Sequence, residues 1–98
     1  MADYIFLMHN AEGAGDLMPL WGPYIESLVA RGVMRGGSAM GGGLCVRKSG
    51  AVPTIAAHIG GYIKVEVDDL EAAKALLPGN PVYEAGGVIE IRELPKTD

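Results

Sequence analysis

The chain contains two histidines, His9 and His58, and imidazole is the side chain best suited to move a proton near neutral pH. His9 directly follows an apolar segment of strand length, at a strand end where a pocket could open. His58 precedes Ile59-Gly60-Gly61 and could line the same pocket. Each also has a plainer interpretation, as a solvated loop histidine for His9 and as the start of a strand for His58. The sequence therefore offers both as candidate general bases.

The sequence gives less support to a metal site or to a catalytic cysteine. The spacing of the two histidines resembles no helix-based ligand motif, and a single cysteine cannot form a thiolate cage, so we predict no metal and no cofactor. A catalytic cysteine needs an activating base in positive surroundings. Arg47 and Lys48 lie next to Cys45 in sequence, but no base can be assigned, so Cys45 is predicted to be a small apolar filler.

A ligand site is the second possibility. Trp21 and Tyr24 share a helical stripe that could be core or could form an aromatic wall for a small molecule. Tyr62, Asn80 and Tyr83 could add polar groups to that pocket. Arg35 could hold a ligand carboxylate, or could be an exposed strand residue.

The second half of the chain, from residue 60 to 94, has the pattern strand, helix, strand. Alternation of apolar and polar residues predicts strands at 62–67 and 88–92. A helix is expected to start at Asp68 or Asp69, with Glu71 completing a capping box and Pro78-Gly79 ending the helix.

The first half has a similar order. Residues 4–8 predict a strand and residues 9–15 a loop. An irregular turn at 16–20 and a helix at 22–31 should follow, since proline inside a helix is costly. A strand is expected at 33–40, with a bulge at Gly36-Gly37. Residues 41–59 predict a flap, with a short hairpin turning near Ser49-Gly50.

This order predicts an α+β fold of the ferredoxin-like, split β-α-β type, in which two helices cover one face of an antiparallel sheet. The strands at 62–67 and 88–92 are expected to present apolar residues to both faces of the sheet. A second copy of the chain packed through the uncovered face would bury those residues, so a homodimer is predicted.

The bulk composition sets further limits. A chain of 98 residues predicts one domain spanning 1–98, with a tail at 95–98. The net charge of −4 and the absence of any basic run argue against nucleic acid and anionic membranes as partners. No apolar run approaches the ~20 residues of a membrane span, and no signal peptide is recognised, so we predict a cytoplasmic protein.

Three segments, at 21–40, 60–73 and 86–92, resemble the YCII-related family in its DGPF-type branch. The resemblance implies a dimeric α+β barrel. One branch of the family carries a His and an Asp proposed as a catalytic pair, and these positions fall on Trp21 and Asn80 here. Indole and amide groups cannot replace that pair as acid and base. The Asp-Gly-Pro-Phe signature is also absent, and the segment between Val46 and Gly60 is short.

The leading hypothesis is therefore a YCII-like homodimer that binds a small aromatic or carboxylate-bearing metabolite in a pocket between sheet and helices, with weak or no catalysis. The alternative is a cofactor-independent lyase, isomerase or dehydrochlorinase that uses His9 or His58 as base. A purely structural interaction module is the third. A base beside the pocket would favour the enzyme, and a pocket with only aromatic and methionine walls would favour binding.

Overall fold

The computed structural model describes residues 1–10 and 15–96, and its strands form one four-stranded antiparallel sheet. The elements follow in the order β1 (Ala2–His9), α1 (Met18–Ala30), β2 (Met34–Ala39), β3 (Ile59–Val67), α2 (Leu70–Lys74), α3 (Pro81–Glu84) and β4 (Ile89–Leu94). The predicted loop at 9–15 and the predicted tail at 95–98 lie partly outside the described residues. None of the helices in the described part is long and apolar enough to cross a membrane.

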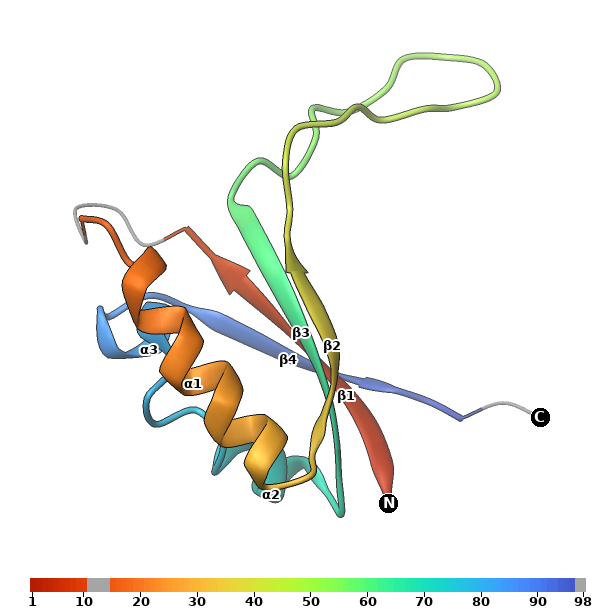
Figure 1. Ribbon diagram of the computed structural model, residues 1–98. Helices are drawn as coiled ribbons and strands as arrows, with labels where there is room; N and C mark the ends of the chain where they lie inside the picture. The colour runs from red at the N-terminus through yellow and green to blue at the C-terminus, as the bar shows by residue number, and fades with distance from the viewer. Residues whose placement is uncertain (11–14, 97–98) are drawn as a thin grey trace.

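The sheet order β2-β3-β1-β4 is that of a ferredoxin-like fold, so the predicted fold class is confirmed. All three helices lie against one face of the sheet (Figure 1). The described chain is correspondingly flat, with principal extents of 46 × 42 × 18 Å. No helix or strand of the described residues covers the opposite face.

The hydrophobic core lies between the sheet and the helices. Tyr4, Phe6 and Met8 point from β1 into this layer, because alternate side chains of a strand face the same side. Their neighbours on β3 do the same, and Leu28 of α1 packs against them as a fully buried residue.

Apolar residues on β3 and β4 were expected on both faces of the sheet, and this expectation is wrong. Ile63, Val65 and Val67 are all buried on the helix side, because they are spaced two residues apart. The uncovered face is mixed: Ile5 and Leu7 lie on β1, and charged residues lie beside them on β3 and β4. We refer to it below as the open face.

The start of α1 differs from the prediction. Pro19 lies at one of the first two helical positions, where a missing N–H removes no bond, and the helix runs without interruption from Met18. Pro23 is accommodated inside the helix. The predicted irregular turn at 16–20 followed by a helix from residue 22 is therefore wrong, since one continuous helix covers most of that range.

The segment after β3 contains two short helices where one was predicted. Asp69, and not Asp68, is the N-cap of α2, and its Oδ1 accepts a hydrogen bond from the backbone N–H of Ala72 at 2.8 Å. The capping box with Glu71 therefore does not form, because Glu71 lies one residue too early. The helix α3 was not predicted.

Residues 40–58 form an arm that projects from the end of the sheet beyond β2 and β3 (Figure 1). The predicted hairpin is wrong, because no strand forms in this segment, although residues 48–50 do bend. Leu44 and Val46 are 75% and 83% exposed. The predicted bulge near Gly36 is present, since the register between β2 and β3 shifts between Met34 and Gly36.

Candidate functional site

A cavity of ≈ 550 Å³ lies between α1 and the sheet. Its walls are mainly apolar, and their large side chains include Met8, Leu17, Trp21, Ile25, Met34 and Val82. Asn10 and Ser38 add polar groups near the strand ends. No arginine or lysine is among the described residues that line the cavity. The arrangement is suited to a small, uncharged and largely apolar molecule.

Trp21 and Tyr24 lie on the same helix but have different environments. Trp21 lines the cavity and meets Tyr24 edge-on, with ring centroids 6.1 Å apart and planes at 68°. Tyr24 is buried outside the cavity lining, and its hydroxyl donates a hydrogen bond to the carbonyl oxygen of Leu76 at 2.9 Å. Burial raises the pKa of the Tyr24 phenol, so the group stays protonated. Tyr24 is thus a core residue.

Glycines allow the backbone to form part of the cavity floor. A Cβ added at Gly37 would lie 2.7 Å from the carbonyl oxygen of Tyr62, which is closer than real Cβ contacts allow. Gly37, Gly60 and Gly61 all contribute to the lining. The pairs Gly36-Gly37 and Gly60-Gly61 therefore lie where the backbones of β2 and β3 approach each other closely, and Gly60 also lies against Asn10 after the end of β1.

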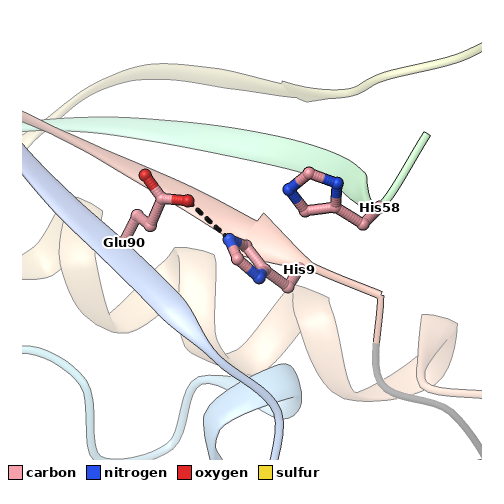
Figure 2. Close-up of side chains that lie close together, drawn as sticks. All are labelled: His9, His58 and Glu90. Carbon is pink, nitrogen blue, oxygen red and sulfur yellow. Dashed lines mark hydrogen bonds and ion pairs between the residues drawn. The ribbon is translucent and has the colours of Figure 1, made fainter. Parts of the chain in front are cut away.

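The two histidines meet on the open face, together with Glu90 (Figure 2). The Nε2–H of His9 donates a hydrogen bond to Oε1 of Glu90 at 2.7 Å. The His58 ring packs edge-on against the His9 ring, with centroids 4.7 Å apart and planes at 75°. Three titratable side chains from β1, β4 and the segment before β3 thus form one cluster.

Strand alternation separates this cluster from the cavity. Met8 points to the helix layer, whereas Glu90, the hydrogen-bond partner of His9, pairs with the open-face residue Leu7. The His9 imidazole is therefore directed to the open face, although His9 also borders the cavity where β1 ends. Tyr62 likewise pairs with Leu7, and alternation directs its ring away from the helices, although the residue also contributes to the cavity lining as predicted. The geometry gives two sites on opposite faces of the sheet.

Glu90 was not predicted as a functional residue. Two signals could have identified it. Glu90 is a polar residue in an alternating strand, and the predicted fold class implies that this last strand pairs with the first, which ends at His9. That pairing places Glu90 two residues from His9 on the same face of adjacent strands. Cys45 belongs to the arm, and it is part of neither the cavity lining nor the histidine cluster.

Arg35 is not at the cavity. Its guanidinium donates hydrogen bonds to the carbonyl oxygens of Gly32 and Met34 and to Glu66 at 3.1 Å. Lys96 bonds the other oxygen of Glu66 at 2.5 Å, and these two cations hold the pKa of Glu66 below its ordinary range. Arg35 therefore belongs to a charge network of the open face, and the cavity has no cation for a ligand carboxylate among the residues described.

Asn80 and Tyr83 were also predicted to bind a ligand, and neither lines the cavity. Asn80 is fully buried and caps α3, and its Oδ1 accepts hydrogen bonds from the backbone N–H groups of Val82 and Tyr83. Tyr83 is 46% exposed on the following turn. Trp21, on the cavity wall, and Asn80, at this cap, occupy the two positions compared above with a catalytic His and Asp.

The fold and the cavity define a ferredoxin-like α+β domain with a ligand-sized space between sheet and first helix. A model of the YCII-related domain matches residues 3–96, and the chain belongs to that family. No protein with a curated description matches the chain in sequence.

A similar solved structure is that of 5-chloro-2-hydroxyhydroquinone dehydrochlorinase from Burkholderia phenoliruptrix AC1100, in complex with 2,5-dihydroxybenzoquinone. It is 14% identical in sequence and superposes with a TM-score of 0.61 over 99% of this chain and 96% of its own. At this identity the likeness supports the fold.

Proposed function

We propose that the protein binds a small, planar, uncharged ring compound in the cavity between α1 and the sheet, without catalysing its conversion there. The observation that carries the proposal is the cavity itself, whose ≈ 550 Å³ lies within the usual range for small-molecule sites and whose apolar wall includes Trp21. An indole face stacks well on aromatic and quinonoid rings.

Two features favour binding over turnover at this cavity. The imidazole of His9 is directed to the opposite face of the sheet, so no described histidine points into the cavity. The lining also lacks an arginine or lysine among the residues described, which favours a neutral ligand over a carboxylate. The ring compound named with the similar dehydrochlorinase suggests the size of probe to use.

The proposed assembly is a cytoplasmic homodimer. Ile5 and Leu7 on the open face are only partly buried, and Leu44 and Val46 on the arm are exposed. A second copy packed against the sheet would bury them. The single cysteine is compatible with a reducing compartment.

The test uses Trp21, the only tryptophan, as an internal reporter. The protein is titrated with hydroquinone as the neutral ring, and with 2,5-dihydroxybenzoquinone and benzoate as rings that are ionised at neutral pH. Binding is followed by Trp fluorescence and by calorimetry. Saturable binding of a neutral ring that is tighter than binding of benzoate is expected. Trp21→Ala should weaken that binding at least tenfold by calorimetry.

Val29→Ala is the matched control, because Val29 lies on the same helix, is 59% exposed and does not line the cavity. Its affinity should equal that of the parent. Absence of saturable binding for every probe, or equal affinity in Trp21→Ala, would contradict the proposal.

A second candidate is a cofactor-independent lyase, isomerase or dehydrochlorinase that works at the open face. The 2.7 Å bond between His9 and Glu90 supports it, because a carboxylate that accepts from one ring nitrogen fixes the orientation and the tautomer of the imidazole. Turnover that His9→Asn abolishes, in a variant whose cavity still binds the neutral ring, would favour this function.

A further inference from the structure

The cluster of His9, His58 and Glu90 contains the donor atoms of a metal site. One ligand atom from each residue lies within 4.8 Å of the other two. His9 and His58 are the only histidines of the chain, and the pairing of β1 with β3 brings them together from opposite halves of the sequence. Figure 2 shows the three side chains converging on the same region of the open face.

The backbone around the cluster is fixed on both sides. The N–H of His9 donates to the carbonyl oxygen of Val88 at 2.9 Å, and the N–H of Asn10 donates to that of His58 at 2.7 Å. The Asn10 side chain adds a hydrogen bond to the carbonyl oxygen of Ala57 at 3.1 Å. The Cα positions are thus held by the sheet, while the partly exposed side chains can turn toward a shared ion.

We propose that these three residues bind a divalent transition-metal ion, with Zn²⁺ as the reference ion. Two neutral imidazoles and one carboxylate suit Zn²⁺, Co²⁺ or Ni²⁺, whereas Ca²⁺ and Mg²⁺ prefer oxygen donors. Bonds of 2.0–2.1 Å in a tetrahedron place ligand atoms about 3.3 Å apart. The present spacing reaches this value by small side-chain rotations, in which the ion replaces the direct contact between His9 and Glu90.

The coordination has a functional consequence. Three protein ligands leave at least one position open, which is the arrangement of catalytic zinc sites and not of closed structural ones. The cluster lies on the face of the sheet opposite the helices, so this inference is independent of the proposed ligand binding. A simpler interpretation is an ordinary hydrogen bond between His9 and Glu90, with the His58 ring packed beside it. The two interpretations differ in the role of His58, which is a ligand in the metal site and only a neighbour of the hydrogen bond.

The experiment measures metal binding directly. Protein treated with EDTA and exchanged into chelator-free buffer is titrated with ZnCl₂ by calorimetry, and with CoCl₂ by visible absorption. One ion per chain is expected, with an absorption band of low-symmetry Co²⁺. Affinity should fall as the pH is lowered from 7.5 to 5.5, because protons compete for the imidazole nitrogens.

Variants locate the ion. His58→Ala and Glu90→Gln should each weaken Zn²⁺ binding at least about tenfold, since even the loss of an outer-shell partner typically costs 10- to 100-fold. Glu93→Gln is the matched control, because Glu93 lies on the same strand but pairs with Tyr4 on the helix face. It should bind as the parent does, and so should Cys45→Ser and Trp21→Ala.

Thermal unfolding of each metal-free variant, monitored by circular dichroism, verifies that the variants are folded. Zn²⁺ should raise the unfolding temperature of the parent and of Glu93→Gln, but not that of His58→Ala. The proposal is overturned by the absence of stoichiometric Zn²⁺ and Co²⁺ binding. It is equally overturned by binding that survives both His58→Ala and Glu90→Gln, or that is lost in Cys45→Ser.

Discussion

Asn80 has a role that its position in the family comparison did not suggest. The side chain is fully buried, and its Oδ1 satisfies two backbone N–H groups at the start of α3. Its Nδ2 has no hydrogen-bond partner among the described residues. A local signal was present, since Asn followed by Pro is typical of an N-cap and a first helical position.

Replacing Asn80 by Ala should therefore destabilise the protein. Two backbone N–H groups would lose their acceptor in a largely buried setting, and we expect the free energy of unfolding to fall by about 1–3 kcal/mol. Urea denaturation measures this change. Glu84→Ala, which removes an exposed contact to the N–H of Gly79, is the control and should cost less than about 0.5 kcal/mol. Equal stability of Asn80→Ala and the parent would refute the capping role.

The sequence predicted the site residues that are recognised by their chemistry. It was less successful for residues whose role depends on the direction of the side chain. His9, His58 and Trp21 were identified because imidazole and indole have distinctive chemistry. Arg35 was misplaced because a register shift between Met34 and Gly36 sets which face of β2 it occupies. A shift of one residue reverses the face of a strand, and Gly36-Gly37 indicated a bulge without showing which side chains it would redirect.

Glu66 should make stability sensitive to acid. Lys96 and Arg35 lower its pKa in the folded state below the ordinary value of 4.5, so the unfolded chain binds the proton more readily. The contribution is fully present above about pH 4.5 and is lost as the pH falls through the lowered value. Glu66→Gln should therefore lose less stability than the parent between pH 6 and pH 3, measured by urea denaturation at each pH. Equal losses in both proteins would contradict this prediction.

At the level of elements, the start of α2 shows how the predicted and observed N-cap residues come to differ by one position. Asp68 and Asp69 have the same chemistry, and only the backbone geometry selects the cap. Asp69 is extended, with φ −159° and ψ 179°, and it places its carboxylate over the N–H of Ala72. The expected start of the helix at Asp68 or Asp69 was thus close, but the capping box was built on the wrong aspartate.

The structure predicts different effects for the two aspartates. Asp69→Ala should lower the free energy of unfolding by about 0.5–2 kcal/mol, the usual loss for an N-cap. Asp68→Ala should leave it within about 0.5 kcal/mol of the parent. Thermal unfolding of the two variants side by side measures the difference. The larger loss in Asp68→Ala would show that the helix begins one residue earlier.

Strands were the most predictable elements, because a period of two is visible in β3 without knowledge of its neighbours. The arm was the least predictable. Ser49-Gly50 does mark a bend, but no residues of the arm pair as strands on either side of it. A hairpin of two strands is marginally stable alone, and the arm projects beyond the sheet that could support one.

For the molecule as a whole, we predict that the chain dimerises. Burial of about 800 Å² per partner is the usual scale of a specific interface, and the open face with the arm provides apolar residues to fill it. Sedimentation equilibrium at micromolar concentration should give twice the 10.2 kDa mass of the chain. Leu44→Ser with Val46→Ser tests the contribution of the arm, and Lys48→Ser, also on the arm, is the control. A monomer at these concentrations would contradict the prediction.

The central position of β1 also affects the order of events during synthesis. β1 pairs with β3 on one side and β4 on the other, and it leaves the ribosome before both of them. β3 emerges only after the arm, and β4 only after both short helices as well. Until then β1 and α1 have no completed sheet to join. Contacts this distant in sequence slow folding and leave a nascent apolar strand exposed. A chaperone would therefore find the most exposed apolar surface on the nascent chain before β3 and β4 have been synthesised.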